Sequence, residues 1–197
     1  MQEIKKVDFY LVVDLEATTS ADGSMPWEER ETIQIGAVLV RASNFALGQS
    51  FACNVRPVVH PVLHSFVTAL TGIQQHDVDR AHPFAVAYPL FRSWFAGAPN
   101  VVFCSWGEYD RNQLQLDCER SGIPYSMPEH LNLKTAFSAS QGFRRRYSLS
   151  RALQRCGLNF DGVPHNALAD ALNTARLLPW IVGGRRLTQP ACQGQSS

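Results

Sequence analysis

An apolar strand that ends in two acidic residues constrains the fold of this chain more than any other stretch. Residues 7–14 form a mostly hydrophobic run, and Glu16 follows Asp14 after one residue. Side chains alternate between the faces of a strand, so Asp14 and Glu16 point to one side and Leu15 to the other. Two neighbouring carboxylates repel each other, and partial burial increases the cost. The pair therefore needs protonation, a basic partner or a hard cation such as Mg²⁺ or Mn²⁺.

Size and composition indicate one globular domain. The chain has 197 residues, of which 45% are hydrophobic and 18% are charged, as is usual for soluble proteins. A net charge of +1 argues against a tight architectural DNA binder and leaves room for an enzyme that holds a chain end briefly. We predict a domain over residues 1–182. The polar, aperiodic residues 183–197 are predicted to form a disordered tail.

Cysteine usage and hydropathy favour a cytoplasmic protein. The five cysteines are odd in number and contain no C-x-x-C pair, so neither a disulfide framework nor a zinc ribbon is expected. The N-terminal stretch is interrupted by acids and lacks a cleavage site, and we interpret it as a strand, not a signal peptide. No run reaches the roughly 18 apolar residues of a membrane span, so no membrane partner is expected. The oligomeric state stays open, with a slight preference for a monomer.

The order of strands and helices predicts a mixed α/β sheet with helices on its faces. Three strands separated by a loop and a short turn indicate an antiparallel meander over residues 7–14, 32–40 and 49–55. The short apolar run 100–105 is typical of a strand in a parallel sheet. Hydrophobic spacing predicts helices over residues 63–70, 84–95, 108–121, 133–140, 148–156 and 166–182.

Two further acids lie where helices are predicted to begin. Asp110 falls in a first helical turn, where the helix dipole tolerates a carboxylate; taken alone, it is better explained as a favourable first-turn acid. Asp170 lies about one turn inside an apolar helix that Asn166 caps, and a solvated helix face does not explain it. His165 precedes this cap on a loop. Most lone loop histidines are surface residues, but histidine titrates near neutral pH and suits proton transfer.

The ordered set of motifs resembles the DEDDh family of 3′–5′ exonucleases, within the RNase H-like superfamily, over about residues 7–180. Asp14-x-Glu16 resembles the first motif, residues 105–110 the second, and His165-x₄-Asp170 the third. The Trp-Gly run before Asp110 resembles the same segment in the Eri-type subgroup, which is related to the histone-mRNA 3′-end exonuclease. The resemblance implies an RNase H-like five-stranded mixed sheet, in which an antiparallel meander and parallel strands are flanked by helices on both faces. It makes residues 1–182 an exonuclease domain.

The resemblance also implies catalysis with two divalent ions, Mg²⁺ or Mn²⁺. Asp14, Glu16, Asp110 and Asp170 carry four formal negative charges, which two divalent ions would neutralise. In the family pattern Asp14 binds both ions, and Glu16 and Asp170 bind the first. Asp110 acts through a metal-bound water. His165 is implied as the general base that deprotonates the attacking water. The expected products are nucleoside 5′-monophosphates, released one at a time.

Six residues are implied in substrate binding. The Glu16 carboxylate and the Ala17 backbone are expected near the terminal 3′-hydroxyl. Phe66 and Tyr109 match positions at which the Eri-type subgroup stacks rings on the last base, an interaction worth about 1–3 kcal/mol. From its helical spacing alone, Phe66 fits a core position equally well, and Leu70 fits the core better than the site. The whole set is Glu16, Ala17, Thr18, Phe66, Leu70 and Tyr109.

The leading hypothesis is a metal-dependent 3′–5′ exonuclease acting on single-stranded ends, with RNA or short oligonucleotides favoured over DNA because the subgroup mostly acts on RNA. A non-catalytic nucleic-acid-binding module on the same fold is the alternative, although a binder has no need for four uncompensated acids. A structural protein with surface acids is a third reading, against which Asp170 argues. Arg144–Arg146 fit phosphate contacts and a solvated charge run equally well. The chain departs from the family pattern at Gln34, where an acid is common.

Overall fold

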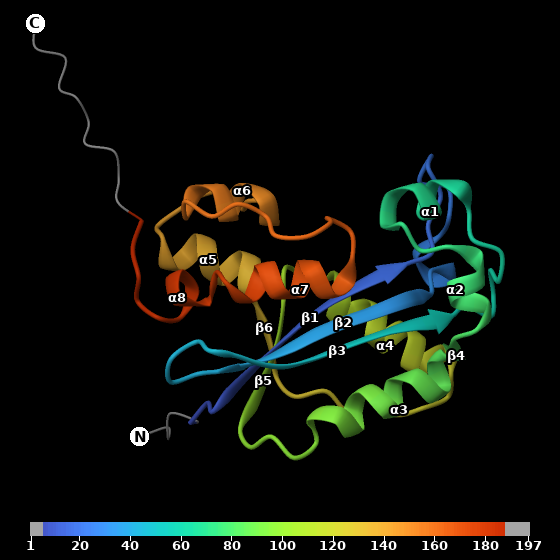
Figure 1. The fold of residues 1–197 in the computed structure, drawn as a ribbon, viewed down its shortest axis with the longest axis horizontal. Coiled ribbons are helices and arrows are strands. Elements are labelled where there is room, and N and C mark those ends of the chain that lie inside the picture. Colours follow the sequence, from blue (N-terminus) through green and yellow to red (C-terminus); the bar gives the residue numbers. More distant parts are fainter. Residues whose placement is uncertain (1–5, 188–197) are drawn as a thin grey trace, which may run out of the picture.

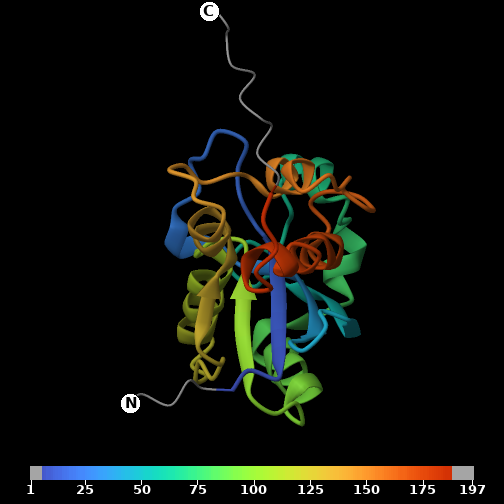
Figure 2. The same cartoon turned by 90° about the vertical axis from the view of Figure 1, so that its left-hand side faces the viewer.

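The computed structural model describes residues 6–187, in which a mixed six-stranded sheet has the order β4-β3-β2-β1-β5-β6. β1 (Phe9–Ala17), β2 (Thr32–Arg41) and β3 (Leu47–Arg56) form the predicted antiparallel meander. β5 (Val101–Ser105) pairs with β1 in parallel, and β6 (His130–Asn132) pairs with β5 in the same way. Figure 2 shows β6, β5 and β1 side by side. The mixed α/β fold is therefore confirmed.

The sheet has one strand more than the predicted five. β4 (His82–Pro83) pairs with the end of β3 in parallel, and its two residues are too few to show an alternating pattern. β1 also runs on to Ala17, past the predicted end at residue 14, so both acids lie within the strand. Of the predicted tail, residues 183–187 contain neither helix nor strand, and residues 188–197 lie outside the described part of the chain.

Helices cover both faces of the sheet (Figure 1). One face carries α3 (Phe84–Phe95) and α4 (Tyr109–Arg120). The opposite face carries four helices: α5 (Leu133–Ser140), α6 (Leu149–Arg155), α7 (Ala167–Ala175) and α8 (Leu178–Ile181). The short η1 (Trp27–Glu29), α1 (Ser65–Thr71) and α2 (Gln75–Asp79) lie in the connections around β2 and β3. Within residues 6–187, no helix has the length and apolar character to cross a bilayer.

The alternation of β1 divides the interior into two cores. Leu11, Val13 and Leu15 pack toward α3 and α4, whereas Val12 packs toward α5 and α7. Asp14 and Glu16 have the parity of Val12, so their carboxylates project on the α7 side. The single apolar strand therefore serves both cores and still presents two acids to one helix.

The predicted helix over residues 166–182 is wrong in its length. The structure ends α7 at Ala175 and begins the short α8 at Leu178. The ring of Pro179 has no N–H and clashes with the carbonyl four residues earlier, which is that of Ala175. The proline therefore breaks the helix where the hydrophobic pattern continues.

A third, smaller core holds α1 and α2 against the start of β2. Ile33 of β2 packs there with Leu63, Val67 and residues of the α2 region. The core interpretation of Leu70 is wrong, because Leu70 and Phe66 are each 37% exposed. Val67 and Thr71 are the residues of α1 that face inward. Helical spacing identified the helix but assigned its inner face incorrectly.

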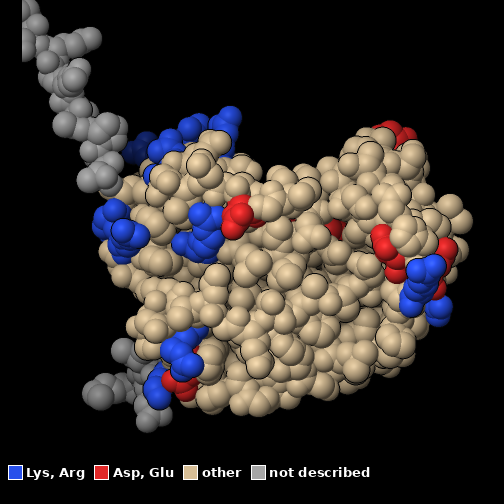
Figure 3. Space-filling model, in the orientation of Figure 1, with Lys and Arg blue, Asp and Glu red and all other residues tan. Residues whose placement is uncertain are grey.

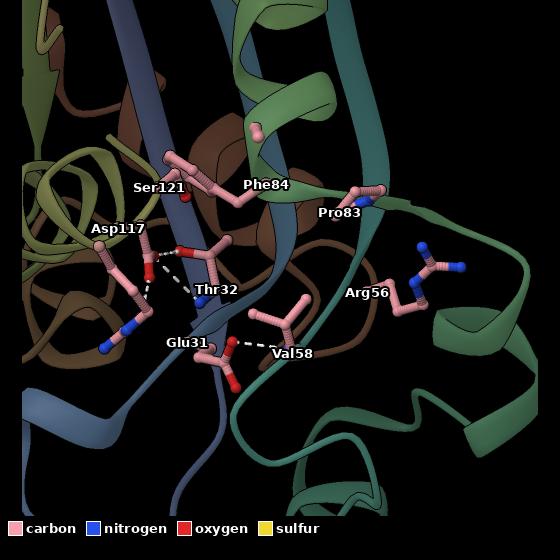
Figure 4. Close-up of a pocket in the computed structure, with 10 residues that line it drawn as sticks. Glu31, Thr32, Arg56, Val58, Pro83, Phe84, Asp117 and Ser121 are labelled. Carbon is pink, nitrogen blue, oxygen red and sulfur yellow. Dashed lines mark hydrogen bonds and ion pairs between the residues drawn. The ribbon is translucent and has the colours of Figure 1, made fainter. Parts of the chain in front are cut away.

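Buried acids fix the start of β2 on the α4 face, beside a pocket with a volume of about 190 Å³. Figure 4 shows the residues that line this pocket. Asp117 of α4 accepts hydrogen bonds from the Thr32 amide at 3.1 Å and the Thr32 hydroxyl at 2.7 Å. Glu31 accepts the backbone N–H groups of residues 58–60 at 2.7–2.9 Å. Thr32 pairs with Ala17, so these contacts also hold the end of β1 in place.

Candidate active site

Three carboxylates converge where β1 meets the first turn of α7. Oxygens of Asp14, Glu16 and Asp170 lie within 4.8 Å of one another. α7 can approach the sheet closely because Gly36, the β2 partner of Asp14, has no side chain. A Cβ atom on Gly36 would lie 2.1 Å from the Ala167 carbonyl carbon. A glycine in one strand therefore places the acid of the helix beside the acids of the neighbouring strand.

Asp110 is held against β1 but outside that group of three. It lies in the first turn of α4 and is 5% exposed. β5 pairs with β1 only as far as Cys104. Beyond that point the Asp110 Oδ1 atom accepts the Leu15 N–H at 3.0 Å. The fourth acid therefore occupies the position that a continued β5 would have filled, next to the acids of β1.

Burial disfavours ionisation of all four carboxyls, and repulsion from neighbouring acids adds to this effect at Asp14, Glu16 and Asp110. Burial is the main cause of the raised pKa of Asp14, followed by the charges of Asp110, Asp170 and Glu16. Burial, then Asp170 and Asp110, raises the pKa of Glu16 to about 8. Burial raises the pKa of Asp110 to about 6 against the lowering effect of the Leu15 N–H, and it also raises the pKa of Asp170.

The kind of ligand that this site can bind follows from its lack of lysine and arginine partners. Among residues 6–187, the ion pairs that lysine and arginine form are Lys6–Asp8, Arg111–Glu108 and Arg120–Asp117. None of these involves the four converging acids. Clustered, buried or half-buried carboxylate oxygens that lack a lysine or arginine partner are suited to divalent cations that prefer oxygen ligands, such as Mg²⁺ and Mn²⁺.

His165 lies on the loop directly before α7. Its backbone adopts a left-handed φ of 62°, and its N–H donates to the Asp170 Oδ2 atom at 2.7 Å. Asn166 caps the helix by accepting the Ala169 N–H at 3.1 Å, as predicted. The His165 side chain is exposed. Burial raises the pKa of Asp170, and the backbone N–H and then the charge of His165 act against this effect. The imidazole therefore lies at the open edge of the acid cluster.

The six residues expected to bind substrate fall into different environments. Ala17 ends β1 just after a register shift that follows Glu16. Thr18 is 3% exposed, and its hydroxyl accepts the Glu31 N–H at 2.9 Å, so its visible role is to join β1 to β2. Phe66, Leu70 and Tyr109 present exposed apolar surface, each at 37%. These three side chains are available to a ligand, and that of Thr18 is not.

Trp27 is a candidate that sequence reasoning missed. It lies in η1, between β1 and β2, where the sequence predicts only a loop. Its ring meets the Tyr109 ring edge-on, with 5.2 Å between the centroids. The available signal was a tryptophan in an otherwise polar loop, but nothing local relates residue 27 to residue 109. The contact adds a second ring to the aromatic surface beside Asp110.

The family model for Exonuclease (RNase T) matches residues 11–178. The match spans β1 to the start of α8 and therefore includes every acid of the site. This chain belongs to the exonuclease family. The resemblance to the DEDDh group is confirmed as well, because the nuclease domain of 3'hExo, a DEDDh family member bound to rAMP, has a TM-score of 0.78 at 27% identity, covering 87% of this chain and 90% of that one.

Other members of the exonuclease family are also similar to this chain. Human ERI1 exoribonuclease 2 is 31% identical over 88% of this chain. The structure described as 3'-end specific recognition of histone mRNA stem-loop by 3'-exonuclease has a TM-score of 0.82 at 26% identity, covering 88% of this chain and 63% of that chain. This chain spans 28% of the length of the human and Xenopus laevis ERI1 exoribonuclease 2 sequences. The Eri-type subgroup is therefore confirmed for the exonuclease segment.

Gln34, which departs from the common family pattern, anchors the N-terminus of α7. Its Oε1 atom accepts the Ala167 N–H at 2.9 Å, and its Nε2 atom donates to the Asn54 Oδ1 atom at 3.0 Å. Gln34 also pairs with Glu16 across β1 and β2. A neutral amide thus satisfies an otherwise unbonded helix N–H without adding a charge beside the acids.

Replacing Gln34 by methionine is expected to destabilise the fold by about 1–3 kcal/mol, because the buried Ala167 N–H loses its acceptor at nearly constant side-chain volume. For a chain of this size the loss corresponds to about 2–4 °C of melting temperature per kcal/mol. Thermal unfolding measures it, and Gln49→Met on the exposed part of β3 is the control. Equal melting temperatures for the two variants would remove Gln34 as the anchor of α7.

Proposed function

We propose that this chain is a metal-dependent 3′–5′ exonuclease that removes nucleoside 5′-monophosphates from single-stranded 3′ ends, with RNA or short oligonucleotides preferred over DNA. The observation that carries the proposal is the convergence of Asp14, Glu16 and Asp170 within 4.8 Å, without an ion pair to a lysine or arginine among residues 6–187. The preference for RNA is supported by relatives named exoribonucleases and by related structures with rAMP and a histone mRNA stem-loop.

The family implies divalent metal ions, and we assign two, Mg²⁺ or Mn²⁺, to this site. Asp14, Glu16 and Asp170 would hold them, and Asp110 would contribute through water. When bound, the ions neutralise the acids and stabilise the negative charge that develops on the attacking and leaving oxygens. The raised pKa values of the four carboxyls support this assignment, since a cation would compensate negative charges that burial, and at Asp14, Glu16 and Asp110 also repulsion, makes unfavourable.

His165 acts as the general base in this proposal. It takes a proton from water, whose oxygen attacks the last phosphorus atom, and the bond to the preceding 3′-oxygen breaks. The phosphate leaves on the 5′-oxygen of the released nucleotide, and the shortened strand takes a proton from solvent to form its new 3′-hydroxyl. The backbone bond from His165 to Asp170 supports the role, because it fixes the loop beside the acids and leaves the imidazole exposed.

End selection is assigned to the region where β1 stops. The Glu16 carboxylate and the Ala17 backbone would contact the terminal 3′-hydroxyl at the register shift of β1. The rings of Phe66 and Tyr109 would stack on the terminal base, with Leu70 beside them. Their exposure, 37% in each case, supports this role over a core role, and stacking tolerates any base.

A 5′-labelled 20-nucleotide single strand tests the proposed function. With Mg²⁺ or Mn²⁺ the chain should shorten the label stepwise and release nucleoside 5′-monophosphates, and EDTA should stop the reaction. Matched single- and double-stranded RNA and DNA give the polarity and the sugar preference. If the ladder stays unchanged with fresh Mn²⁺ while the strand still binds, the exonuclease proposal is wrong. The chain would then be a non-catalytic nucleic-acid-binding module.

A further inference from the structure

Positive charge is concentrated in one part of this chain. Residues 131–197 contain nine of the eighteen lysines and arginines but two of the seventeen acidic residues. The described part of this segment includes α5, α6, α7 and α8, which cover the face toward which Asp14 and Glu16 point. The overall charge of +1 therefore conceals a basic layer on the side of the acid cluster.

Five exposed arginines gather where α5 connects to α6. We call this group the arginine surface: Arg144, Arg145, Arg146, Arg151 and Arg155. Figure 3 shows Lys and Arg side chains over the α5–α6 side and a hollow between this side and the α1 end. Among residues 6–187, arginine forms ion pairs with carboxylates at Arg111–Glu108 and Arg120–Asp117. The arginine surface therefore carries no carboxylate partner within the described chain.

The backbone beneath these arginines is anchored. The Ser138 hydroxyl donates to the Arg145 carbonyl at 3.0 Å, and the Trp106 Nε1 atom donates to the Tyr147 carbonyl at 3.2 Å. The Arg155 guanidinium lies 4.6 Å from the centre of the Tyr147 ring. Guanidinium groups that are already ordered lose less conformational entropy when they bind an anion than those of a flexible, solvated segment. This organisation distinguishes the segment from a simply solvated run.

The arginine surface also borders the acid site. Trp106, which donates a hydrogen bond to the Tyr147 carbonyl, directly follows β5, and two residues separate it from α4. Tyr147 directly follows Arg146, so this hydrogen bond places the arginine surface next to the turn that leads into α4, whose first turn contains Asp110. A strand whose 3′ end lies at the acids can therefore leave the site along these arginines.

We propose that the arginine surface binds the phosphates of nucleotides upstream of the 3′ terminus. The inference rests on the proposed exonuclease function and adds a substrate-binding track to it. Arginine suits this role because its planar fork pairs with phosphate oxygens, and its charge gives sequence-independent affinity that falls with salt. The four acids repel a polyanion, so a separate cationic surface retains the strand between successive cleavages.

The test measures binding of a 5′-fluorescein 20-nucleotide single-stranded RNA by anisotropy in EDTA, where metal-dependent turnover is off. Arg144→Gln together with Arg146→Gln removes two charges and spares Arg145, which lies over the Tyr147 ring. We expect Kd to rise about tenfold and the slope of log affinity against log salt to become shallower by about 1.4, because each phosphate contact on a single strand contributes about 0.7. The Arg144→Lys and Arg146→Lys pair should retain the slope.

A matched control removes two charges elsewhere. Lys6→Gln together with Arg41→Gln alters the opposite end of β1 and should leave Kd within about twofold of wild type. With Mg²⁺, the loss of kcat/KM in the Arg144/Arg146 variant should be greater on the 20-mer than on a trinucleotide. The proposal would be overturned if Kd and the salt slope of the Arg144/Arg146 variant are unchanged, or if the control variant loses as much affinity for RNA. The arginine surface would then bind a different acidic partner. A wild-type chain that binds RNA but shortens no strand would contradict the proposed function alone.

Discussion

Asp14→Asn is expected to lose at least about 10³-fold in turnover while the metal-free protein becomes more stable. Turnover falls because the carboxylate that both ions would share is gone. Stability rises because burial, followed by the charges of Asp110, Asp170 and Glu16, raises the pKa of Asp14, so that ionisation of this carboxyl opposes folding. We therefore expect a higher melting temperature in EDTA, at roughly 2–4 °C for each kcal/mol gained by a chain of this size. A loss of function combined with a gain of stability marks a site built for a cation.

The gain should depend on pH in a defined direction. The carboxyls of the cluster have raised pKa values in the folded chain, with Glu16 moved from 4.5 to about 8. A folded state with raised acid pKa values binds more protons than the unfolded state, so stability is present at low pH and is lost as pH rises. The stability advantage of Asp14→Asn in EDTA should therefore grow between pH 5 and pH 8.

Metal titration completes this measurement. Saturating Mg²⁺ at about 100 times its Kd should stabilise wild type by about 2.7 kcal/mol per site and should barely change Asp14→Asn. Asp161→Asn, an exposed acid before α7, is the matched control and should behave as wild type does. Calorimetry that finds undiminished metal binding to Asp14→Asn would show that the ligand assignment is wrong.

His165→Ala is expected to lose at least about 10²-fold in kcat and to keep its affinity for metal. The imidazole would supply the base, whereas the contact with Asp170 comes from the backbone N–H, which every substitution except proline retains. The left-handed φ of 62° disfavours alanine, so a second variant is needed. His165→Asn suits this backbone better, because asparagine adopts the left-handed region more readily.

Single-turnover rates of both variants, together with Mg²⁺ titration by calorimetry, separate chemistry from folding. Both should be slow, and both should bind metal as wild type does. Comparable turnover in His165→Asn and wild type would remove the histidine as base. A joint loss of metal binding and turnover would show that the residue acts by holding Asp170.

Local patterns in the sequence were sufficient for most elements of the fold. The alternation of β1 predicted that Asp14 and Glu16 share one face, and the packing of Val12 against the α7 side agrees. Asn166 marked the start of α7, because a side-chain cap acts within three residues. The core position of Leu70 was predicted wrongly, because spacing does not show which side of a short helix meets the sheet. The length of the 166–182 helix was also wrong, because Pro179 breaks a hydrophobic pattern that continues past it.

Contacts between distant residues decided the rest. Gly36 admits the backbone of Ala167, and Gln34 binds its N–H, but no local pattern relates positions separated by more than 130 residues. The net charge of +1 likewise gave no sign of the arginine surface, because a net charge does not show where in the structure the charges lie. By itself, the sequence determined which residues were acidic, apolar or helix-capping. The tertiary structure alone decided which of them meet, because the sheet register and the approach of α7 depend on packing between elements, not on the order of residues within one.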